Sequence, residues 1–359
     1  MKKVLSCVLS LGLCGAAVLG MAACGEGPTT PPGGVAKFSF AGSLQELYGG
    51  SGYPQAVLVA KTSVIENDPA AVSAMESYMT GSAGFLASAA PAEVISLLDG
   101  CYDDADLTHS FNANNLTAEV IANCSVKYTP AIACRQTVTD FLTALNKMDS
   151  KLVTGVPEEA FFYGGGPTTG LPEGHYSVYA PDGAPALALT NAISQSRVTG
   201  APTVFDYHIV SSDQIRLQVT GEMPADFCVL PVNLAANLLG SGTNYKLLGT
   251  VTNGNMFLLS TLSTAPTVSS TEQLAYLKGE KVGVVQLTNV PGLTFRLVLE
   301  RAGVPYKIIS ETDDELDTDK VNLVPINNAA TEVTLAGGYN YFLCPEPAAS
   351  AKVKATANK

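Results

Sequence analysis

The sequence of 359 residues is poor in the side chains on which metal and nucleic-acid sites depend. It has no tryptophan, only three histidines (His109, His175 and His208), and no pair of histidines at the spacing of a zinc motif. Basic residues number 20 against 32 acidic ones, and no Lys/Arg cluster stands out. Because a nucleic acid needs a basic surface to bind to, we expect no nucleic-acid partner. Neither a metal ion nor another cofactor is expected.

The signature motifs of several enzyme classes are also absent. The chain contains no G-x-S-x-G elbow, no S-x-x-K and no G-x-x-x-x-G-K-[ST] loop. This absence disfavours hydrolases and nucleotide-using enzymes, although catalysis does not depend on a recognised motif.

Residues 1–23 have the composition of a secretory signal peptide. Lys2 and Lys3 precede a short apolar run that ends at Met21. Residues 21–24 (MAAC) are similar to a bacterial lipobox, in which the cysteine, here Cys24, is lipidated after cleavage; the alternative is an ordinary signal peptide. Residues 24–34 are rich in Gly, Pro and Thr, which suits a flexible tether. We therefore expect an extracytoplasmic protein, lipid-anchored to the bacterial cell membrane.

Five cysteines follow the tether. Cys228 and Cys344 lie inside apolar, strand-like runs and are expected to be small buried hydrophobes. Cys101, Cys124 and Cys134 lie in one region, and a disulfide among them is left open, because an export signal implies an oxidising compartment.

Short apolar runs alternate with stretches of helical periodicity. The runs cover residues 56–60, 227–232, 256–259, 282–287 and 341–344. The helical stretches cover residues 69–79, 91–98, 117–123, 130–148, 184–194, 213–220, 234–239, 271–277 and 293–302. Because the runs are apolar throughout and helices separate them, the pattern predicts an α/β fold with parallel sheets.

Four strand-to-helix turns carry polar or backbone-exposing residues. They lie at residues 180–185 (APDGAP), 230–234 (LPVNL), 286–293 (QLTNVPGL) and 344–349 (CPEPAA). Each turn alone is ordinary loop chemistry. In open parallel sheets, however, ligands bind beyond the carboxyl ends of strands, so four such turns together favour a shared cleft.

Several segments resemble the substrate-binding lipoproteins of bacterial ABC importers. Residues 230–236 (LPVNLAA), 247–255 (LLGTVTNGN), 277–284 (LKGEKVGV) and 289–295 (NVPGLTF) carry this resemblance. Residues 52–60 (GYPQAVLVA), 179–187 (YAPDGAPAL) and 345–349 (PEPAA) belong to it as well. The group that the chain is most similar to comprises the type 2 binding proteins for nitrate, sulfonates, taurine and thiamine-pyrimidine precursors.

The resemblance implies a two-lobed type 2 periplasmic-binding-protein fold, with parallel-rich sheets flanked by helices and a ligand cleft between the lobes. Lobe 1 would comprise residues 58–163 and 171–258, and lobe 2 residues 35–55 and 262–359. The hinge strands would lie near residues 54–61 and 256–260.

The order of the segments departs from the family. Residues 35–163 are similar to the family's C-terminal third but stand first, which predicts a circular permutation. Residues 164–170 (GGGPTTG) would then join the old termini as an exposed, glycine-rich loop.

The implied function is capture of a small organic or oxyanion solute and its delivery to an ABC permease, by a monomer that performs no bond chemistry. The expected ligand-binding residues are Asp182, Gly183, Ala184, Asn233, Asn255, Gln286, Thr288, Asn289 and Glu346. Two other functions stay open: an enzyme of thiamine-pyrimidine synthesis on the same fold, and a sensory binding module without a permease. The export signal and the scattered histidines disfavour the enzyme.

Several of these residues have more than one reading. The backbone N–H groups of Gly183 and Ala184 suit an anion, whereas Asp182 and Glu346 suit an amine or a pyrimidine. The alternative for both carboxylates is a role at a helix N-terminus. Tyr53 and Tyr179 suit stacking on a ring, although a core position is more common for tyrosine.

Overall fold

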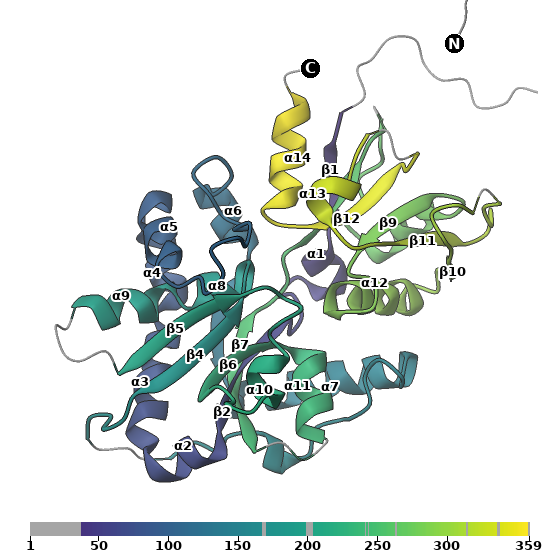
Figure 1. The fold of residues 1–359 in the computed structure, drawn as a ribbon. Helices are drawn as coiled ribbons and strands as arrows, with labels where there is room; N and C mark the ends of the chain where they lie inside the picture. The colour runs from purple at the N-terminus through teal and green to yellow at the C-terminus, as the bar shows by residue number, and fades with distance from the viewer. Residues whose placement is uncertain are drawn as a thin grey trace, which may run out of the picture. The chain divides into compact units, whose positions relative to one another are not determined.

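In the computed structural model, the strands in the described part of the chain form two six-stranded sheets (Figure 1). Sheet A has the order β1 (Ser39–Ser43), β8 (Met256–Ser260), β12 (Tyr341–Pro345), β9 (Lys281–Val285), β11 (Val321–Ile326) and β10 (Tyr306–Ile308). Sheet B has the order β3 (Val126–Pro130), β7 (Tyr245–Thr252), β2 (Ala56–Lys61), β6 (Phe227–Pro231), β4 (Tyr176–Pro181) and β5 (Phe205–Val210).

The structure describes residues 37–166, 170–198, 204–240, 242, 244–262, 264–313, 315–335 and 338–357. The predicted signal peptide, Cys24 and the tether lie outside these residues. Of the predicted join at 164–170, residues 167–169 are also outside, and its four glycines are exposed. Within the described ranges, every helix is too short or too polar to span a bilayer.

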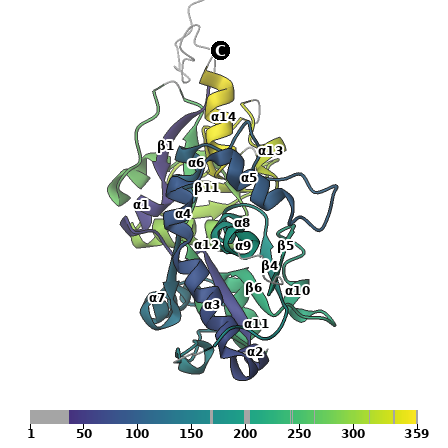
Figure 2. The same ribbon diagram turned by 90° about the vertical axis from the view of Figure 1, so that its left-hand side faces the viewer.

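Helices cover both sheets. Those that follow or precede the strands of sheet A are α1 (Leu44–Gly49), the 3-10 helix η2 (Thr271–Leu277), α12 (Val290–Arg301), α13 (Ala329–Glu332) and α14 (Ala348–Ala357). Those attached to sheet B are α2 (Thr62–Asn67), α3 (Pro69–Thr80), α4 (Ser82–Ser88), α5 (Pro91–Asp99), α6 (Ala118–Asn123), α7 (Ala131–Met148), the 3-10 helix η1 (Glu159–Phe161), α8 (Ala184–Ala188), α9 (Thr190–Val198), α10 (Leu217–Thr220) and α11 (Val232–Gly240). Figure 2 shows α3, α4, α8 and α9 together on one side of sheet B.

The predicted helices at residues 69–79 and 117–123 are confirmed as α3 and α6. Asp68 caps α3 by accepting a hydrogen bond from the backbone N–H of Ala71, and Pro69 occupies the first turn, where no N–H is needed. Thr117 caps α6 in the same way. The predicted helix at 213–220 is shorter than expected, because only Leu217–Thr220 is α-helical.

The expectation of parallel sheets is wrong, since both sheets are mixed. Strand β2 runs antiparallel to β6 and β7, and β8 runs antiparallel to β1 and β12. The apolar run at 56–60 reflects burial of both faces and not strand direction. Val57 and Val59 belong to the core that includes α7, whereas Leu58 and Ala60 belong to the core that includes α3. The coarser prediction of an α/β fold is confirmed.

One hydrophobic core joins sheet A to the α7 side of sheet B. Tyr53 stacks on Phe141 of α7 with ring centroids 6.0 Å apart, and Tyr48 of α1 contacts both rings. The apolar run at 256–259 is confirmed as a strand, and Met256–Ser260 belongs to sheet A. An apolar run predicts a strand but does not say which sheet the strand joins.

The chain passes between the sheets at two places, between Gly49 and Ala56 and between Thr252 and Met256. The two crossing segments lie side by side, because Tyr53 N–H donates to the Asn253 carbonyl at 3.2 Å and Gln55 N–H donates to the Thr252 carbonyl at 3.0 Å. The predicted hinge strands are therefore sheet strands, and the crossings come immediately before them.

Candidate functional site

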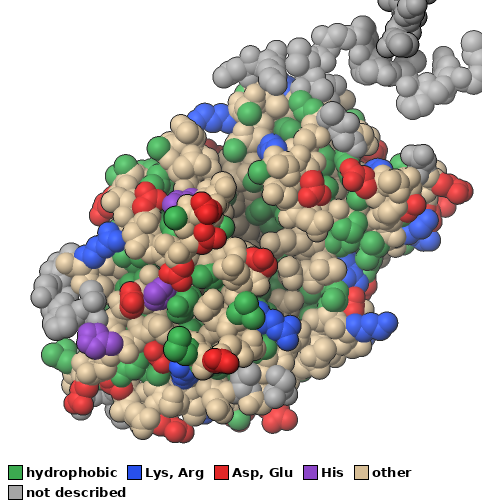
Figure 3. All heavy atoms as spheres, in the orientation of Figure 1, with side chains coloured by type: hydrophobic (Ala, Val, Ile, Leu, Met, Phe, Trp, Pro, Cys, Tyr) green, Lys and Arg blue, Asp and Glu red, His purple; other side chains and the backbone are tan. Residues whose placement is uncertain are grey.

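A cavity of about 510 Å³ lies where the two sheets meet the crossing segments. All nine residues predicted to bind ligand line it: Asp182, Gly183, Ala184, Asn233, Asn255, Gln286, Thr288, Asn289 and Glu346. Its volume is in the range of small-molecule sites. Figure 3 shows this face of the molecule hollowed near its centre, where most of the visible surface is uncharged.

Eight of the nine predicted residues reach the cavity from just after the end of a strand. Asp182 and Gly183 follow β4, Asn233 follows β6 as the second residue of α11, and Glu346 follows β12. Asn255 lies on the crossing segment before β8. The ends of these strands lie around one cavity, which brings together polar groups that are far apart in the sequence.

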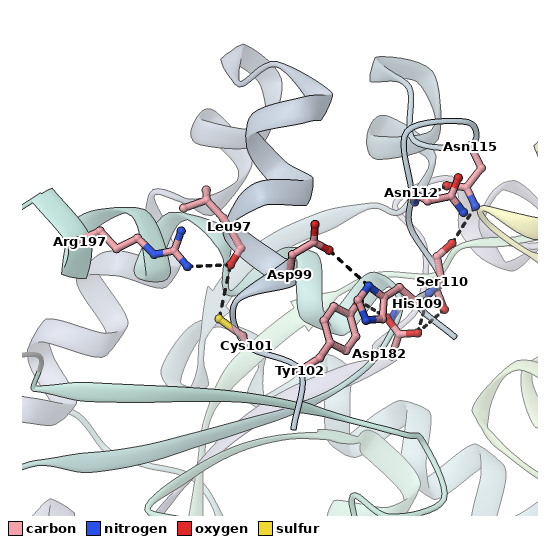
Figure 4. Close-up of polar contacts among 11 residues, drawn as sticks. Leu97, Asp99, Cys101, Tyr102, His109, Ser110, Asn112, Asn115, Asp182 and Arg197 are labelled. Carbon is pink, nitrogen blue, oxygen red and sulfur yellow. Dashed lines mark hydrogen bonds and ion pairs between the residues drawn. The ribbon is translucent and has the colours of Figure 1, made fainter. Parts of the chain in front are cut away.

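The Asp182 carboxylate is fully occupied by hydrogen bonds from the protein. Its Oδ1 atom accepts from Tyr102 Oη and from Gly183 N–H, each at 2.8 Å. Its Oδ2 atom accepts from Ser110 N–H at 2.8 Å and from Ser110 Oγ at 2.7 Å. Since a carboxylate offers about four acceptor sites, this side chain fastens the loop that carries Tyr102 and Ser110 to the end of β4 (Figure 4). These four hydrogen bonds leave Asp182 without a free acceptor site for a ligand amine.

The same loop is closed by an aromatic contact. His109 lies flat on Tyr102, with ring centroids 3.6 Å apart, and its Nδ1 atom is 3.3 Å from Asp99 Oδ1 (Figure 4). Burial, followed by the nearby Asp182 charge, raises the pKa of Tyr102, so this phenol stays a donor. The loop residue that lines the cavity is Ser110.

Glu346 is also held by the protein. It is 2% exposed, and its carboxylate accepts from Asn123 Nδ2 at 2.8 Å, Ser350 Oγ at 2.7 Å and Ser350 N–H at 3.1 Å. Asn123 is the last residue of α6, so this carboxylate connects the helices of sheet B to the end of β12. The helix-terminus alternative describes Glu346 better than an amine site does.

The wall formed by sheet A is a tight turn between β9 and α12. Gln286 has φ 55°, and Asn289 N–H donates to the Gln286 carbonyl at 2.9 Å. A Cβ on Gly292 would lie 2.3 Å from the Leu287 backbone, so only glycine lets α12 pack this close. Gln286, Thr288 and Asn289 are exposed and face the cavity.

Two residues that line the cavity each have a buried side-chain oxygen without a partner among the described residues. Asn233 is 6% exposed, and its Oδ1 atom accepts no hydrogen bond from the described residues. The Oε1 atom of Gln55 is likewise buried and unpaired among the described residues. Because a buried acceptor is more stable when it is hydrogen-bonded, either oxygen would gain from a solute that donates to it.

Sequence reasoning missed Gln55, Ser110, Lys151, Arg216 and Asn237, which also line the cavity. Gln55 stands directly before a predicted strand, within a segment that carried the family resemblance. Asn237 follows Asn233 by four residues, which places both on one face of α11. Ser110, Lys151 and Arg216 lie outside regular structure, and no local pattern points to them.

The accessible charge of the cavity is positive. Lys151 and Arg216 are exposed at its edge, and neither forms an ion pair with another described residue. The carboxylates of Asp182 and Glu346 are taken up by internal donors. The charged side chains of the cavity that a ligand could still pair with directly are therefore Lys151 and Arg216.

Tyr53 and Tyr179 do not line the cavity. Tyr53 is 0% exposed, and burial raises its pKa. Tyr179 stacks on His208, with ring centroids 4.4 Å apart. Both tyrosines are therefore packed in or against the core, and neither is placed to stack on a ligand ring in the cavity.

The five cysteines in the described part of the chain are free and buried, so no disulfide joins Cys101, Cys124 and Cys134. Burial raises the pKa of Cys344 to about 12, which keeps that thiol protonated. Within the described ranges there is no group of three metal-ligating side chains.

Comparisons with protein-family models, with curated proteins and with solved structures found no match to this chain.

Proposed function

We propose that the protein is an extracytoplasmic solute-binding lipoprotein that captures a small organic or oxyanion solute and delivers it to an ABC permease. In this proposal sheets A and B belong to the two lobes of a type 2 periplasmic-binding-protein fold, and the cavity is the ligand cleft. The protein acts as a monomer, anchored through Cys24, and catalyses no reaction.

The observation that carries the proposal is the pair of unpaired acceptors, Asn233 Oδ1 and Gln55 Oε1, in a cavity lined by the ends of four strands. These acceptors lose free energy because they have no hydrogen bond, and a solute that donates to them restores it. The cavity is bounded by both sheets and by both crossing segments, so a solute there touches every part that would move in a lobe closure.

The rotated segment order is part of the same proposal. Phe38 N–H donates to Thr356 Oγ1 at 2.9 Å, so the first described strand and the last helix are adjacent. Helices α3 to α7 lie with sheet B, whereas β1 and α1 lie with sheet A. Both relationships are those that a rotated order of a two-lobed chain requires.

The function is tested by measuring the thermal unfolding of the mature protein with alkanesulfonates, nitrate, amino acids and pyrimidines. A solute at 100 times its Kd should add about 2.7 kcal/mol of stability. An Asn233→Leu variant that unfolds normally should lose this response. Failure of all four classes to shift the transition would contradict solute capture.

Two further measurements separate the alternatives. A stabilising solute recovered unchanged by mass spectrometry argues against the enzyme of pyrimidine synthesis. Co-purification with a permease argues against a sensory module. Loss of radiolabelled palmitate from a Cys24→Ser variant tests the anchor.

A further inference from the structure

Three polar groups at the cavity form a directional hydrogen-bond chain. Asn255 Nδ2 donates to the Glu346 backbone carbonyl at 3.4 Å, and Gln55 Nε2 donates to Asn255 Oδ1 at 2.9 Å. The Glu346 N–H also donates to the Asn255 carbonyl at 3.0 Å, which holds the two backbones together. All three residues line the cavity.

The backbone carbonyl of Glu346 determines the orientation of the side-chain amides of Asn255 and Gln55. The two ends of a side-chain amide have nearly the same shape, so partners decide which end points where. A backbone carbonyl only accepts, so it selects the Nδ2 end of Asn255. The Oδ1 end of Asn255 then selects the Nε2 end of Gln55. Gln55 is left with its carbonyl oxygen as the group that has no partner.

Asn233 provides a second polar group on the same cavity. It is 6% exposed, its Oδ1 atom is unpaired, and no hydrogen bond from its side chain to a described residue is present. Unlike Gln55, it has no neighbour that selects its orientation. Gln55 is therefore the acceptor of defined direction, and Asn233 is an adaptable one.

The charges of the cavity restrict the kind of ligand group that can donate a hydrogen bond to Gln55. An ammonium group needs a carboxylate when it leaves water, but the carboxylates of Asp182 and Glu346 already accept four and three hydrogen bonds from the protein. Lys151 and Arg216 add positive charge at the edge.

We infer that Gln55 is a specificity-determining residue that reads a neutral N–H or O–H donor on an uncharged or anionic solute, and that Asn255 is the residue that positions it. This inference rests on the proposed function, because it names the class of solute captured at the same site. It predicts weaker binding of simple amines and of solutes that carry no donor.

The test compares probes of equal shape by calorimetry on the mature protein. Isethionate carries a hydroxyl, propanesulfonate a methyl and taurine an ammonium group at the same position, and 4-aminopyrimidine pairs with 4-methylpyrimidine. In at least one set the neutral donor should bind roughly ten- to a hundredfold tighter than its matched analogues. Gln55→Met and Asn255→Leu should each reduce this preference to about twofold or less. Gln214→Met, at an exposed glutamine outside the cavity, should preserve it.

A second measurement needs no ligand. In ¹⁵N-labelled protein, the side-chain amide hydrogens of Gln55 should exchange with solvent more slowly than those of Gln214, and Asn255→Leu should remove the difference. Equal exchange in the wild type would overturn the inference. Equal binding of donor and methyl probes would also overturn it while leaving solute capture intact. Absence of binding by all five probes would overturn the inference, and failure of nitrate and amino acids as well would go against solute capture itself.

Discussion

Gln55 and Asn255, 200 positions apart in the chain, are joined by a hydrogen bond of 2.9 Å between their side chains. Each lies on one of the two segments by which the chain passes between sheet A and sheet B. The contact is therefore a polar link between two residues that line the cavity, and it joins the only crossings present in the described part of the chain. Any relative movement of the two sheets has to preserve this link or break it.

Substitution by leucine should affect stability differently at Asn233 and at Asn237. Asn233→Leu removes an unpaired buried oxygen, so the free energy of unfolding should stay the same or rise by about 1 kcal/mol while solute binding is lost. Asn237 is one helical turn away, and its amide bonds to Leu152 and Thr154. Asn237→Leu should therefore destabilise the protein by about 1–3 kcal/mol. Urea denaturation of both variants makes the comparison, and equal losses of stability would show that Asn233 is an ordinary structural residue.

Asp182→Asn should loosen the loop that carries Tyr102 and Ser110. An amide in place of the carboxylate presents hydrogens where three chain positions already donate, so at least one bond to Ser110 or Tyr102 is lost. We expect a loss of about 2–3 kcal/mol in denaturant unfolding, because hydrogen bonds to charged groups are the stronger ones. Hydrogen exchange should accelerate in residues 102–116 and not in β11. Uniform acceleration across the chain would contradict a local fastening role.

Protonation of Asp68 should make the protein less stable at acid pH. Burial by itself raises the pKa of this carboxyl, but hydrogen bonds from Tyr176 Oη and from the backbone N–H groups of Glu173, Ala71 and Gly174 outweigh burial and lower the pKa. The unfolded chain then binds the proton more tightly, at an ordinary pKa of about 3.9. The contribution of Asp68 to stability is therefore complete above that pKa and is lost as pH falls through the folded value.

Asp68→Asn tests this dependence directly. The variant should be less stable than the wild type at pH 7, by about 1–3 kcal/mol. The gap between the two proteins should narrow as the pH is lowered from about 5 to 3, followed by chemical denaturation at each pH. A gap that stays constant over this interval would show that Asp68 does not titrate with folding.

Arg296 of α12 and Asp149 after α7 form a largely buried ion pair at 3.0 Å, with 8% and 22% of their side chains exposed. Asp149→Asn leaves the guanidinium without its charge partner and should cost about 3–5 kcal/mol. The exposed pair Arg135–Glu159 is the matched control, and Glu159→Gln should change stability by less than about 1 kcal/mol. Thermal unfolding of both variants makes the comparison. Similar small effects would mean that solvent reaches the Arg296 pair freely.

Much of the candidate site was predictable because its residues follow strands. The apolar runs before Asp182, Asn233 and Glu346 identify strands, and the turn residues after them identify where each strand ends. Lys151 and Arg216 could not be found in this way, since they reach the cavity only because the segments after α7 and before α10 fold back toward it. The roles of Asp182 and Glu346 were equally hidden, because a sequence does not show which donors a carboxylate meets.

The amino-acid sequence alone determined the α/β class, the helices at residues 69–79 and 117–123, and the turn residues that end the strands. These features depend on local periodicity and on hydrogen bonds between near neighbours. Only the tertiary structure decided strand direction, the sheet to which Met256–Ser260 belongs, and which polar groups at the cavity remain unpaired. Burial of both faces makes parallel and antiparallel strands alike in composition, and a hydrogen bond such as that between Gln55 and Asn255 exists only after two distant segments have been brought together.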